Sequence, residues 1–364
     1  MSTMRALIYA GVGNYVLQDR PIPKVQLPTD AVVKMVHTTI CGTDLHILKG
    51  DVATCAAGRI LGHEGVAIVQ EVGPAVQSFK PGDKVIISCI TACRSCYYCR
   101  KNMASHCVDG GWILGHTIDG TQAEYTRIPH ADGSLHHCVK GASEEDQVLI
   151  SDVLPTGYEC GAVNGNIETG GVVAVVGPGP IGLGVVITAQ LYSPSTIIVI
   201  GRGENRLKAA KQLGATHTIV SGPNTVSEVM KLTNGRGVDT VVEAVGVQES
   251  FELCQDLVAP GGTIANVGVY GSKVDLHLEK LWSHNISGSC ERKEYSWGLT
   301  ASTALKTRLV DAVTSPMLIR LLDMGKLNTE GLITHRFTFR EIAEAYKTFG
   351  NASEHNALKM LISF

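Results

Sequence analysis

Short β-branched runs alternate with amphipathic segments through the second half of the chain. The run 171–176 is continuously apolar, which is typical of a strand buried on both faces of a sheet. Strands that alternate with helices predict a parallel, doubly wound sheet. We expect strands at 171–176, 196–200, 217–220, 238–243, 263–267 and 285–289, helices at 180–191, 205–213, 225–232 and 248–257, and a turn at 260–262.

The first part of the chain has a different pattern, with short alternating runs and frequent turn residues. Strands are expected at 31–39 and 60–71, after short strands between 5 and 34 that prolines interrupt. Residues 76–90 are expected to form a hairpin-like strand pair about Pro81-Gly82-Asp83. This density of short strands predicts a small barrel-like β domain.

The last part of the chain returns to a mixed pattern after about residue 296. An amphipathic helix is expected at 338–349 and a final strand at 357–362. Both are assigned to the first domain, which makes that domain discontinuous. The expected fold class is α/β, with a β-rich domain over 1–155 and 297–364 and a doubly wound domain over 156–296.

One uncharged segment, 169–201, is long enough to span a bilayer. It contains a glycine- and proline-rich stretch near its middle, at 177–184. Two strands with a glycine turn and a helix between them explain this composition better than a membrane span. The N-terminus lacks a basic region followed by a long apolar stretch and a small-residue cleavage site, so we expect no signal peptide. No Lys/Arg-rich run occurs either, so we expect no membrane partner.

Charge and cysteine content narrow the functional classes. The formal net charge of −3 is spread along the chain and no Lys/Arg-rich run occurs, which argues against nucleic acid as a partner. The 11 cysteines are odd in number and clustered, in a chain too long for a small disulfide scaffold. We therefore expect a protein of the reducing cytoplasm that uses cysteines in metal sites.

A glycine motif follows the first strand of the predicted parallel sheet. Gly177, Gly179 and Gly182 form G-x-G-x-x-G, with Pro180 and Ile181 at the start of the predicted helix. In this strand–turn–helix context the motif predicts a dinucleotide site, because the glycines allow the turn and the close approach of a pyrophosphate. The alternative is a glycine-rich turn that binds no ligand.

The end of the next predicted strand bears on the choice of cofactor. An acidic residue there would bind the adenosine ribose of NAD(H), but this chain has Gly201 followed by Arg202. An arginine can pair with a 2′-phosphate through its fork of donors, so the pattern favours NADP(H) over NAD(H). The alternative is that Arg202 is a solvated loop residue.

Four cysteines lie close together in the first half of the chain, in a lobe of about 93–107. Cys93, Cys96, Cys99 and Cys107 have the spacing C-x2-C-x2-C-x7-C. Four thiolates can complete a tetrahedral shell around one zinc ion and leave no open position, which predicts a structural zinc site. Iron–sulfur ligation, disulfides and free thiols are the alternatives.

A second set of metal-binding residue types surrounds the sequence that begins at Cys41. Cys41, His63 and Asp152 supply a sulfur, a nitrogen and an oxygen donor, and three such ligands leave a fourth position on zinc open for substrate. Thr43 and His46 add a hydroxyl and an imidazole, as a proton-transfer chain requires. From the chain alone, Asp152 is equally well explained as a helix cap or a partly exposed carboxylate.

These motifs, in this order, resemble the zinc-dependent medium-chain alcohol dehydrogenases over essentially the whole chain. The motifs are Cys41-Gly42-Thr43-Asp44-Leu45-His46, Gly62-His63-Glu64-Gly65, the four-cysteine lobe and the Gly177–Gly182 turn. The resemblance implies a GroES-like catalytic domain, a Rossmann domain and a cleft between them.

The resemblance also assigns roles to individual positions. It makes Cys41 and His63 ligands of a catalytic zinc, Glu64 a conditional ligand or neighbouring carboxylate, Thr43 the hydroxyl that binds the substrate oxygen, and His46 the outer end of a proton relay.

One branch of the family is especially similar to this chain. Asp152 in the third ligand position resembles the NADP-dependent secondary-alcohol branch, with Cys160 as the alternative ligand. Trp112 stands where that branch has a pocket-lining tryptophan, and a buried core tryptophan is the other interpretation. Members of that branch often lack the four-cysteine site, which this chain retains.

The resulting prediction is an oxidoreductase that transfers hydride between NADP(H) and an alcohol/ketone or aldehyde pair, with secondary alcohols preferred. It implies two zinc ions per chain, a small alcohol or carbonyl substrate, and a homodimer or homotetramer. The alternatives are a zinc-dependent polyol (sorbitol-like) dehydrogenase and a non-catalytic protein that binds nucleotide and zinc.

Overall fold

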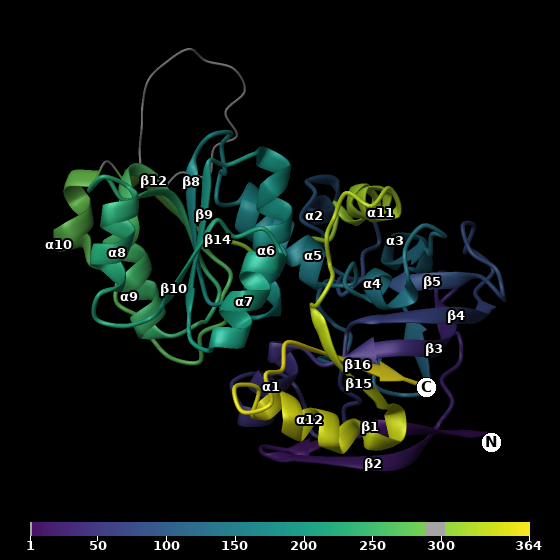
Figure 1. Ribbon diagram of the computed structural model, residues 1–364. Helices are drawn as coiled ribbons and strands as arrows, with labels where there is room; N and C mark the ends of the chain where they lie inside the picture. The colour runs from purple at the N-terminus through teal and green to yellow at the C-terminus, as the bar shows by residue number, and fades with distance from the viewer. Residues whose placement is uncertain (1, 285, 288–302) are drawn as a thin grey trace. The chain divides into compact units, whose positions relative to one another are not determined.

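The computed structural model describes residues 2–284, 286–287 and 303–364. The chain forms two compact units (Figure 1), which we call the β-rich unit, Met1–Pro155 with Val310–Phe364, and the parallel-sheet unit, Thr156–Leu309. No helix in the described ranges has the length and apolar character that crossing a membrane requires.

The parallel-sheet unit is built on a sheet whose described part has the strand order β10-β9-β8-β11-β12-β14-β13. Each neighbouring pair is parallel. The strands are β8 (Val172–Val176), β9 (Thr196–Gly201), β10 (His217–Val220), β11 (Val238–Glu243), β12 (Val258–Asn266), β13 (Ile286–Ser287) and β14 (Thr303–Thr307).

Helices cover both faces of this sheet. Figure 1 shows α6 (Pro180–Ala189) and α7 (Glu204–Gln212) on one face, and α8 (Thr225–Leu232) and α9 (Gln248–Leu257) on the other. Every residue of β8 is buried, as its continuous apolar run predicts for a central strand. The doubly wound α/β architecture is therefore confirmed. The short helices of this unit are η2 (Gly157–Val163, a π-helix), η3 (Gln190–Tyr192), α10 (Leu278–Leu281) and η4 (Trp282–His284).

Three details of the parallel sheet differ from the sequence analysis. The expected turn at 260–262 lies inside β12, where the pairing with β11 is irregular, so the glycines form a bulge in a continuing strand. Of the strand expected at 285–289, only Ile286–Ser287 falls within the described residues. Strand β14 pairs with β12, whereas the sequence analysis assigns 297–364 to the first domain, and we therefore propose a domain boundary near Leu309.

The β-rich unit contains a mostly antiparallel sheet and a separate hairpin. Among the described residues the sheet order is β15-β16-β3-β4-β5-β7, and β6 also pairs with β3, while β1 and β2 form the hairpin. The strands are β1 (Thr3–Gly11), β2 (Asn14–Pro21), β3 (Ala31–Thr39), β4 (Gly65–Val72), β5 (Lys84–Ile87), β6 (Tyr125–Ile128), β7 (Leu135–His137), β15 (Ile333–Thr338) and β16 (Lys359–Ser363).

Short helices connect and cover these strands. They are α1 (Gly42–Lys49), α2 (Tyr97–Arg100), η1 (Ala104–His106), α3 (Ala131–Ser134), α4 (Glu144–Val148), α5 (Val153–Thr156), α11 (Ser315–Asp323), η5 (Phe339–Glu341) and α12 (Ile342–Gly350). The amphipathic helix expected at 338–349 is η5 followed by α12, and the strand expected at 357–362 is β16. The C-terminal segment thus contributes to the first unit.

The hairpin expected at 76–90 is wrong. Only β5 is a strand in this range, and it pairs with β4 and β7. The backbone N–H groups of Gln77 and Ser78 donate to the Asp132 carboxylate, at 3.0 and 2.8 Å, and not to a neighbouring strand. A side-chain acceptor distant in sequence therefore removes the strand that local alternation predicts.

Candidate active site

A buried group of four side chains lies within the β-rich unit: Cys41, His63, Glu64 and Asp152. One ligand atom from each lies within 4.8 Å of all the others, and all four residues are buried. The Cys41 sulfur lies 3.6 Å from Asp152 Oδ2, and His63 Nε2 lies 3.6 Å from the same oxygen. We call these four residues the mixed-donor group.

Three separate segments bring these residues together. Cys41 is the N-cap of α1, where its backbone N–H donates to Asp44 Oδ2 at 2.9 Å. His63 and Glu64 directly precede β4, and Asp152 lies in the turn between α4 and α5. Since the segments are distant in the sequence, only the packing of the β-rich unit defines the group.

Ser151 fixes the turn that carries Asp152 against the start of β4. Its hydroxyl accepts from the Gly65 N–H at 3.1 Å and donates to the Gly65 carbonyl at 3.2 Å. Gly65 follows Glu64, so this reciprocal pair connects the backbones on either side of the mixed-donor group. The sequence analysis did not identify Ser151, because a serine in an apolar run carries no local signal of this contact.

Lys359 is a further buried neighbour that the sequence analysis missed. Its ammonium group donates to Glu64 Oε1 at 2.6 Å, and both side chains are only 1% exposed. Glu64 Oε2 is buried and has no hydrogen-bond partner among the described residues. The ion pair therefore holds one carboxylate oxygen and leaves the other available beside His63, whose Nε2 lies 4.0 Å from Oε1.

In the absence of a metal ion, the mixed-donor group favours the protonated form of its thiol, carboxyl and imidazole side chains. Burial raises the pKa of the Cys41 thiol, and the neighbouring Asp152 raises it further. Burial also raises the pKa of the Glu64 carboxyl, against the opposing effect of Lys359. Burial acts to lower the pKa of His63, but hydrogen bonds with Asp152 and Cys41 outweigh it and hold the pKa well above its usual value.

A metal ion among these donors would reverse these protonation preferences. It would favour the thiolate, the carboxylate and the neutral imidazole, which are the forms that bind metal. Sulfur, imidazole and carboxylate are also the donors that zinc takes in catalytic sites. The unpartnered Glu64 oxygen and the composition of the group therefore fit a zinc ion.

Thr43 and His46 lie beside the mixed-donor group on α1. Thr43 Oγ1 is 3.7 Å from the Cys41 sulfur. His46 is one turn further along the same helix face, with Nδ1 2.8 Å from Asp51 Oδ2. The imidazole is 24% exposed, so it has access to solvent. Asp51, which the sequence analysis did not identify, fixes the ring orientation.

Trp112 packs at the edge of the core of the β-rich unit. It lies against a cluster that includes Ile47 of α1, and its ring stacks on His116 with centroids 4.3 Å apart. The indole is only half-buried. His116 is held in turn by Thr54, whose hydroxyl is 2.6 Å from Nε2. The stacking of His116 thus restricts the orientation of the Trp112 ring on one of its faces.

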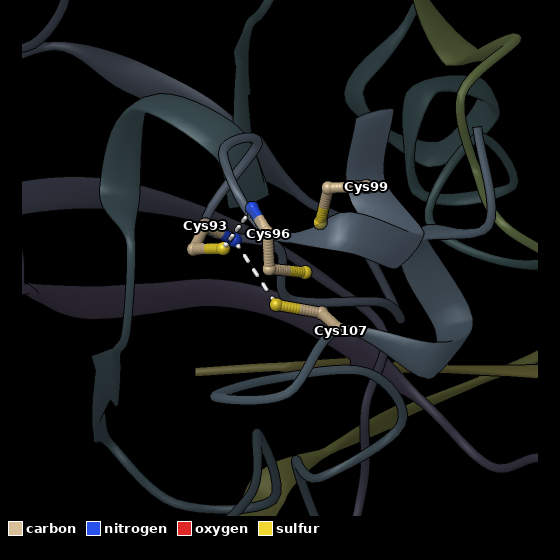
Figure 2. Close-up of side chains that lie close together, drawn as sticks. All are labelled: Cys93, Cys96, Cys99 and Cys107. Atoms are coloured by element: carbon tan, nitrogen blue, oxygen red, sulfur yellow. Dashed lines mark hydrogen bonds between the residues drawn. The ribbon is translucent and has the colours of Figure 1, made fainter. Parts of the chain in front are cut away.

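The four cysteines of the lobe form the second group that could hold a metal, and we call them the four-thiol group. Their sulfur atoms lie within 4.8 Å of one another. Figure 2 shows the side chains converging from α2 and the loops on either side of it. The backbone N–H of Cys96 donates to the Cys93 sulfur at 3.4 Å, and that of Cys93 donates to the Cys107 sulfur at 3.3 Å.

These hydrogen bonds affect the ionisation of the thiols. Burial opposes ionisation of Cys93, but hydrogen bonds from Ser95 and Cys96 lower its pKa to about 6. Burial and the neighbouring thiols raise the pKa of Cys99 to about 12. Four sulfurs at this spacing fit a tetrahedral zinc shell. The other residue weighed as a catalytic ligand, Cys160, lies on η2 in the parallel-sheet unit and belongs to neither group.

The glycine motif forms the turn between β8 and α6. Gly177 has a φ of +106°, a conformation that favours glycine. A Cβ on Gly182 would lie 1.9 Å from the Gly177 carbonyl oxygen, so the first turn of α6 can pack against the end of β8 only with glycine at this position. Gly179 has open space around it, and Pro180 and Ile181 begin α6 with Pro at its first position. The loop thus has the geometry that a dinucleotide pyrophosphate requires.

Gly201 ends β9 for a reason of packing. A Cβ at this position would lie 2.0 Å from Cδ of Pro178, so the proline in the glycine turn excludes any larger residue at 201. The absence of an acidic residue at position 201 is therefore explained by packing against Pro178, independently of the choice of cofactor. Arg202 follows and is exposed, which leaves its guanidinium accessible to a ligand.

Comparisons with known proteins agree with this architecture. Residues 27–141 match the model of the alcohol dehydrogenase GroES-like domain, and residues 180–299 match that of the zinc-binding dehydrogenases. An alcohol dehydrogenase from Cupriavidus necator is 35% identical, with 99% of this chain and 98% of that protein covered. An NADP-dependent isopropanol dehydrogenase from Thermoanaerobacter brockii is 33% identical, with 94% of each covered.

A solved structure is also similar over the full length. The zinc-dependent alcohol dehydrogenase 2 from Streptococcus pneumonia, in its apo form, has 45% identity and a TM-score of 0.90, with 99% of this chain and 98% of that chain covered. The fold and both family models indicate the same protein family. The chain belongs to the zinc-dependent alcohol dehydrogenase family.

Proposed function

We propose that this protein transfers hydride between NADP(H) and a small alcohol/carbonyl pair at the mixed-donor group, with secondary alcohols and their ketones preferred. The observation that carries the proposal is the buried convergence of a thiol, an imidazole and a carboxylate, from Cys41, His63 and Asp152, beside the hydroxyl of Thr43. A structural metal site has no need of that hydroxyl or of the imidazole one turn further on.

Cys41, His63 and Asp152 would hold the zinc ion, and Lys359 would restrain Glu64 as a neighbouring or conditional ligand. The bound zinc supplies Lewis acidity that makes a substrate hydroxyl easier to deprotonate. Thr43 would accept the substrate's hydroxyl proton at Oγ1 while giving up its own hydroxyl proton towards His46. His46, oriented by Asp51, would take up that proton on one ring nitrogen and release a proton to solvent. The burial of the group excludes water from the reacting carbon.

We propose a second, structural role for the four-thiol group. One zinc ion there would link the loops that flank α2, a segment with little apolar core of its own. The whole protein would then carry two zinc ions per chain.

NADP(H) is the proposed cofactor, bound at Gly177–Gly182 with its 2′-phosphate paired to Arg202. The exposed arginine after β9 supports this choice, as does the name of the isopropanol dehydrogenase relative. The cofactor-binding domain would then be the parallel-sheet unit. We further propose that Trp112 lines the substrate pocket and that the protein works as a cytoplasmic homodimer or homotetramer.

A steady-state comparison of NADPH and NADH tests the proposal, with acetone, acetaldehyde, a bulky aryl ketone and a reducible sugar as substrates. We expect NADPH with acetone to give the highest kcat/KM. Fastest turnover of the sugar would instead identify a polyol dehydrogenase. A metal content of one zinc ion per chain with no turnover would favour a non-catalytic protein.

The cofactor preference has its own test in Arg202→Gln. Loss of the guanidinium should weaken NADPH binding about tenfold and leave NADH binding unchanged, since only NADPH carries the phosphate. Arg236→Gln, at an arginine that is 60% exposed in the same unit, is the matched control. Equal losses for both nucleotides would remove Arg202 from cofactor selection.

A further inference from the structure

A cavity in the β-rich unit shares no lining residue with the mixed-donor group. It has a volume of about 390 Å³ and lies between the end of β2 with the residues that follow it, the segments around Arg59 and Asp119, and the start of β6. Three arginines and one carboxylate line it: Arg20, Arg59, Arg127 and Asp119. This excess of guanidinium groups distinguishes the cavity from an ordinary surface hollow.

Two of the three arginines are neutralised by carboxylates. Arg59 Nη1 lies 3.0 Å from Asp119 Oδ1, and Arg127 Nη1 lies 2.9 Å from Oδ2 of the fully buried Asp30. Arg20 donates from Nη2 to the Gly58 carbonyl at 2.7 Å and forms no ion pair within the described ranges. The cavity thus retains one uncompensated positive charge.

The hydrogen bonding of these arginines is also incomplete. The Nε atoms of Arg20 and Arg59 are buried and have no acceptor among the described residues. A buried donor without an acceptor is destabilising, and more so when it belongs to a charged group. The hydrogen bonding of two of the cavity's three arginines is therefore incomplete, in addition to the missing ion pair of Arg20.

The apolar side chains that line the cavity indicate what kind of organic group the anion carries. Ile22, Ile118 and Tyr125 line the same space and are partly exposed, while Ile60 and Met4, which also line it, are almost fully buried. An inorganic ion alone would leave this apolar surface in contact with water. A ligand with a charged head and a short apolar or aromatic group would cover it.

We propose that this cavity binds a small oxyanion, a carboxylate or a phosphate monoester, that carries a short apolar or aromatic group. Arg20 supplies the unpaired charge, and its planar fork matches two oxygens of the ligand head. The site is independent of the proposed redox chemistry, because none of its lining residues belongs to the mixed-donor group or to the glycine turn.

Isothermal titration calorimetry on the zinc-loaded protein saturated with NADP⁺ tests this site, at constant ionic strength. The probes are benzoate, phenyl phosphate and inorganic phosphate. Saturable binding of benzoate or phenyl phosphate, tighter than that of inorganic phosphate, is expected, and the tighter of the two organic probes identifies the head group. Binding of none of the three would overturn the proposal.

Variants then locate the binding. Arg20→Gln should weaken the best probe about tenfold, the value of one charge-assisted contact, while Arg340→Gln, an exposed arginine of the same unit, should have no effect. Arg20→Lys keeps the positive charge and loses the planar guanidinium, so it should weaken binding to an intermediate extent. This variant replaces Arg20→Gln in the test if Arg20→Gln does not fold. Unchanged affinity in both Arg20 variants would place the anion elsewhere and refute the assignment.

Discussion

The mixed-donor group and the four-thiol group both bring metal-binding atoms within the same short distance, yet the chain assembles them in opposite ways. The thiols come from one continuous segment, 93–107, and two of them, Cys93 and Cys96, remain half-exposed. The mixed-donor group comes from three distant segments, and none of its members is more than 7% exposed.

The two arrangements suit different roles. The four-thiol group is suited to cross-linking loops, and the mixed-donor group is suited to a reaction. Four thiolates saturate a tetrahedral ion, and their order depends on local turns. The mixed donors instead rely on neighbours that the fold supplies, namely the Ser151 hydroxyl, the Lys359 ammonium and the Asp44 carboxylate at the cap of α1. Such support holds ligands in place while leaving room for a substrate.

The sharpest test of this contrast removes one ligand from the mixed-donor group. Asp152→Ala should lower turnover at least about a thousandfold, because the metal that activates the substrate is lost or misplaced. His63→Ala should do the same. Fluorescence titration should show NADPH binding unchanged in both.

Asp19→Ala is the matched control, since that carboxylate is 62% exposed and, among the described residues, forms its ion pair with Arg5 alone. It should retain wild-type turnover. Full activity in Asp152→Ala would remove the mixed-donor group from the reaction.

The next test removes the buried cation behind the mixed-donor group. Lys359→Met leaves the Glu64 carboxylate buried without its partner, which should lower the free energy of unfolding by about 3–5 kcal/mol. Chemical denaturation measures this change. Glu64→Gln in the same background should restore a large part of it, because the uncompensated charge is gone.

A cobalt-substituted sample gives a separate readout. Its visible absorption bands report ligand geometry, and Lys359→Met should shift them by freeing Glu64 towards the metal. Identical spectra, with additive losses in the double variant, would show that the ion pair plays no part in positioning Glu64.

The four-thiol group should respond in stability and not in chemistry. Cys96→Ser should remove one of two zinc ions and lower the free energy of unfolding by about 2 kcal/mol or more, because the loops lose their cross-link. At low temperature, kcat should remain within about twofold of wild type.

Cys138→Ser is the control, at a half-buried cysteine outside both groups. It should keep both zinc ions. A thousandfold loss of kcat in a folded Cys96→Ser protein would contradict the separation of the two groups.

The smallest expected effect concerns the proton path beside the mixed-donor group. His46→Ala should reduce kcat about tenfold by removing the outer proton carrier, and imidazole added to the buffer should restore it. Asp51→Asn should have a weaker effect, since the ring is retained but loses its charged partner. A defect in His46→Ala that imidazole does not relieve would indicate a structural role for the ring.

Features that depend on near neighbours in the chain could be predicted from the sequence alone. The strand–turn–helix context of the glycine motif, the β-branched core strands and the clustering of the four cysteines all follow from local spacing, because backbone geometry relates residues a few positions apart in a fixed way. These features predicted the doubly wound sheet and the family resemblance.

Contacts that join distant segments could not be predicted in this way and are visible only in the folded chain. Lys359 is a charged residue in a final strand, and nothing nearby in the sequence shows that β16 pairs with β3 and buries it against Glu64. The same holds for Ser151, for the strand pair that Asp132 displaces, and for Pro178 excluding a side chain at Gly201. Such contacts depend on how whole elements pack, and the energy of packing is not encoded in any single stretch of the chain.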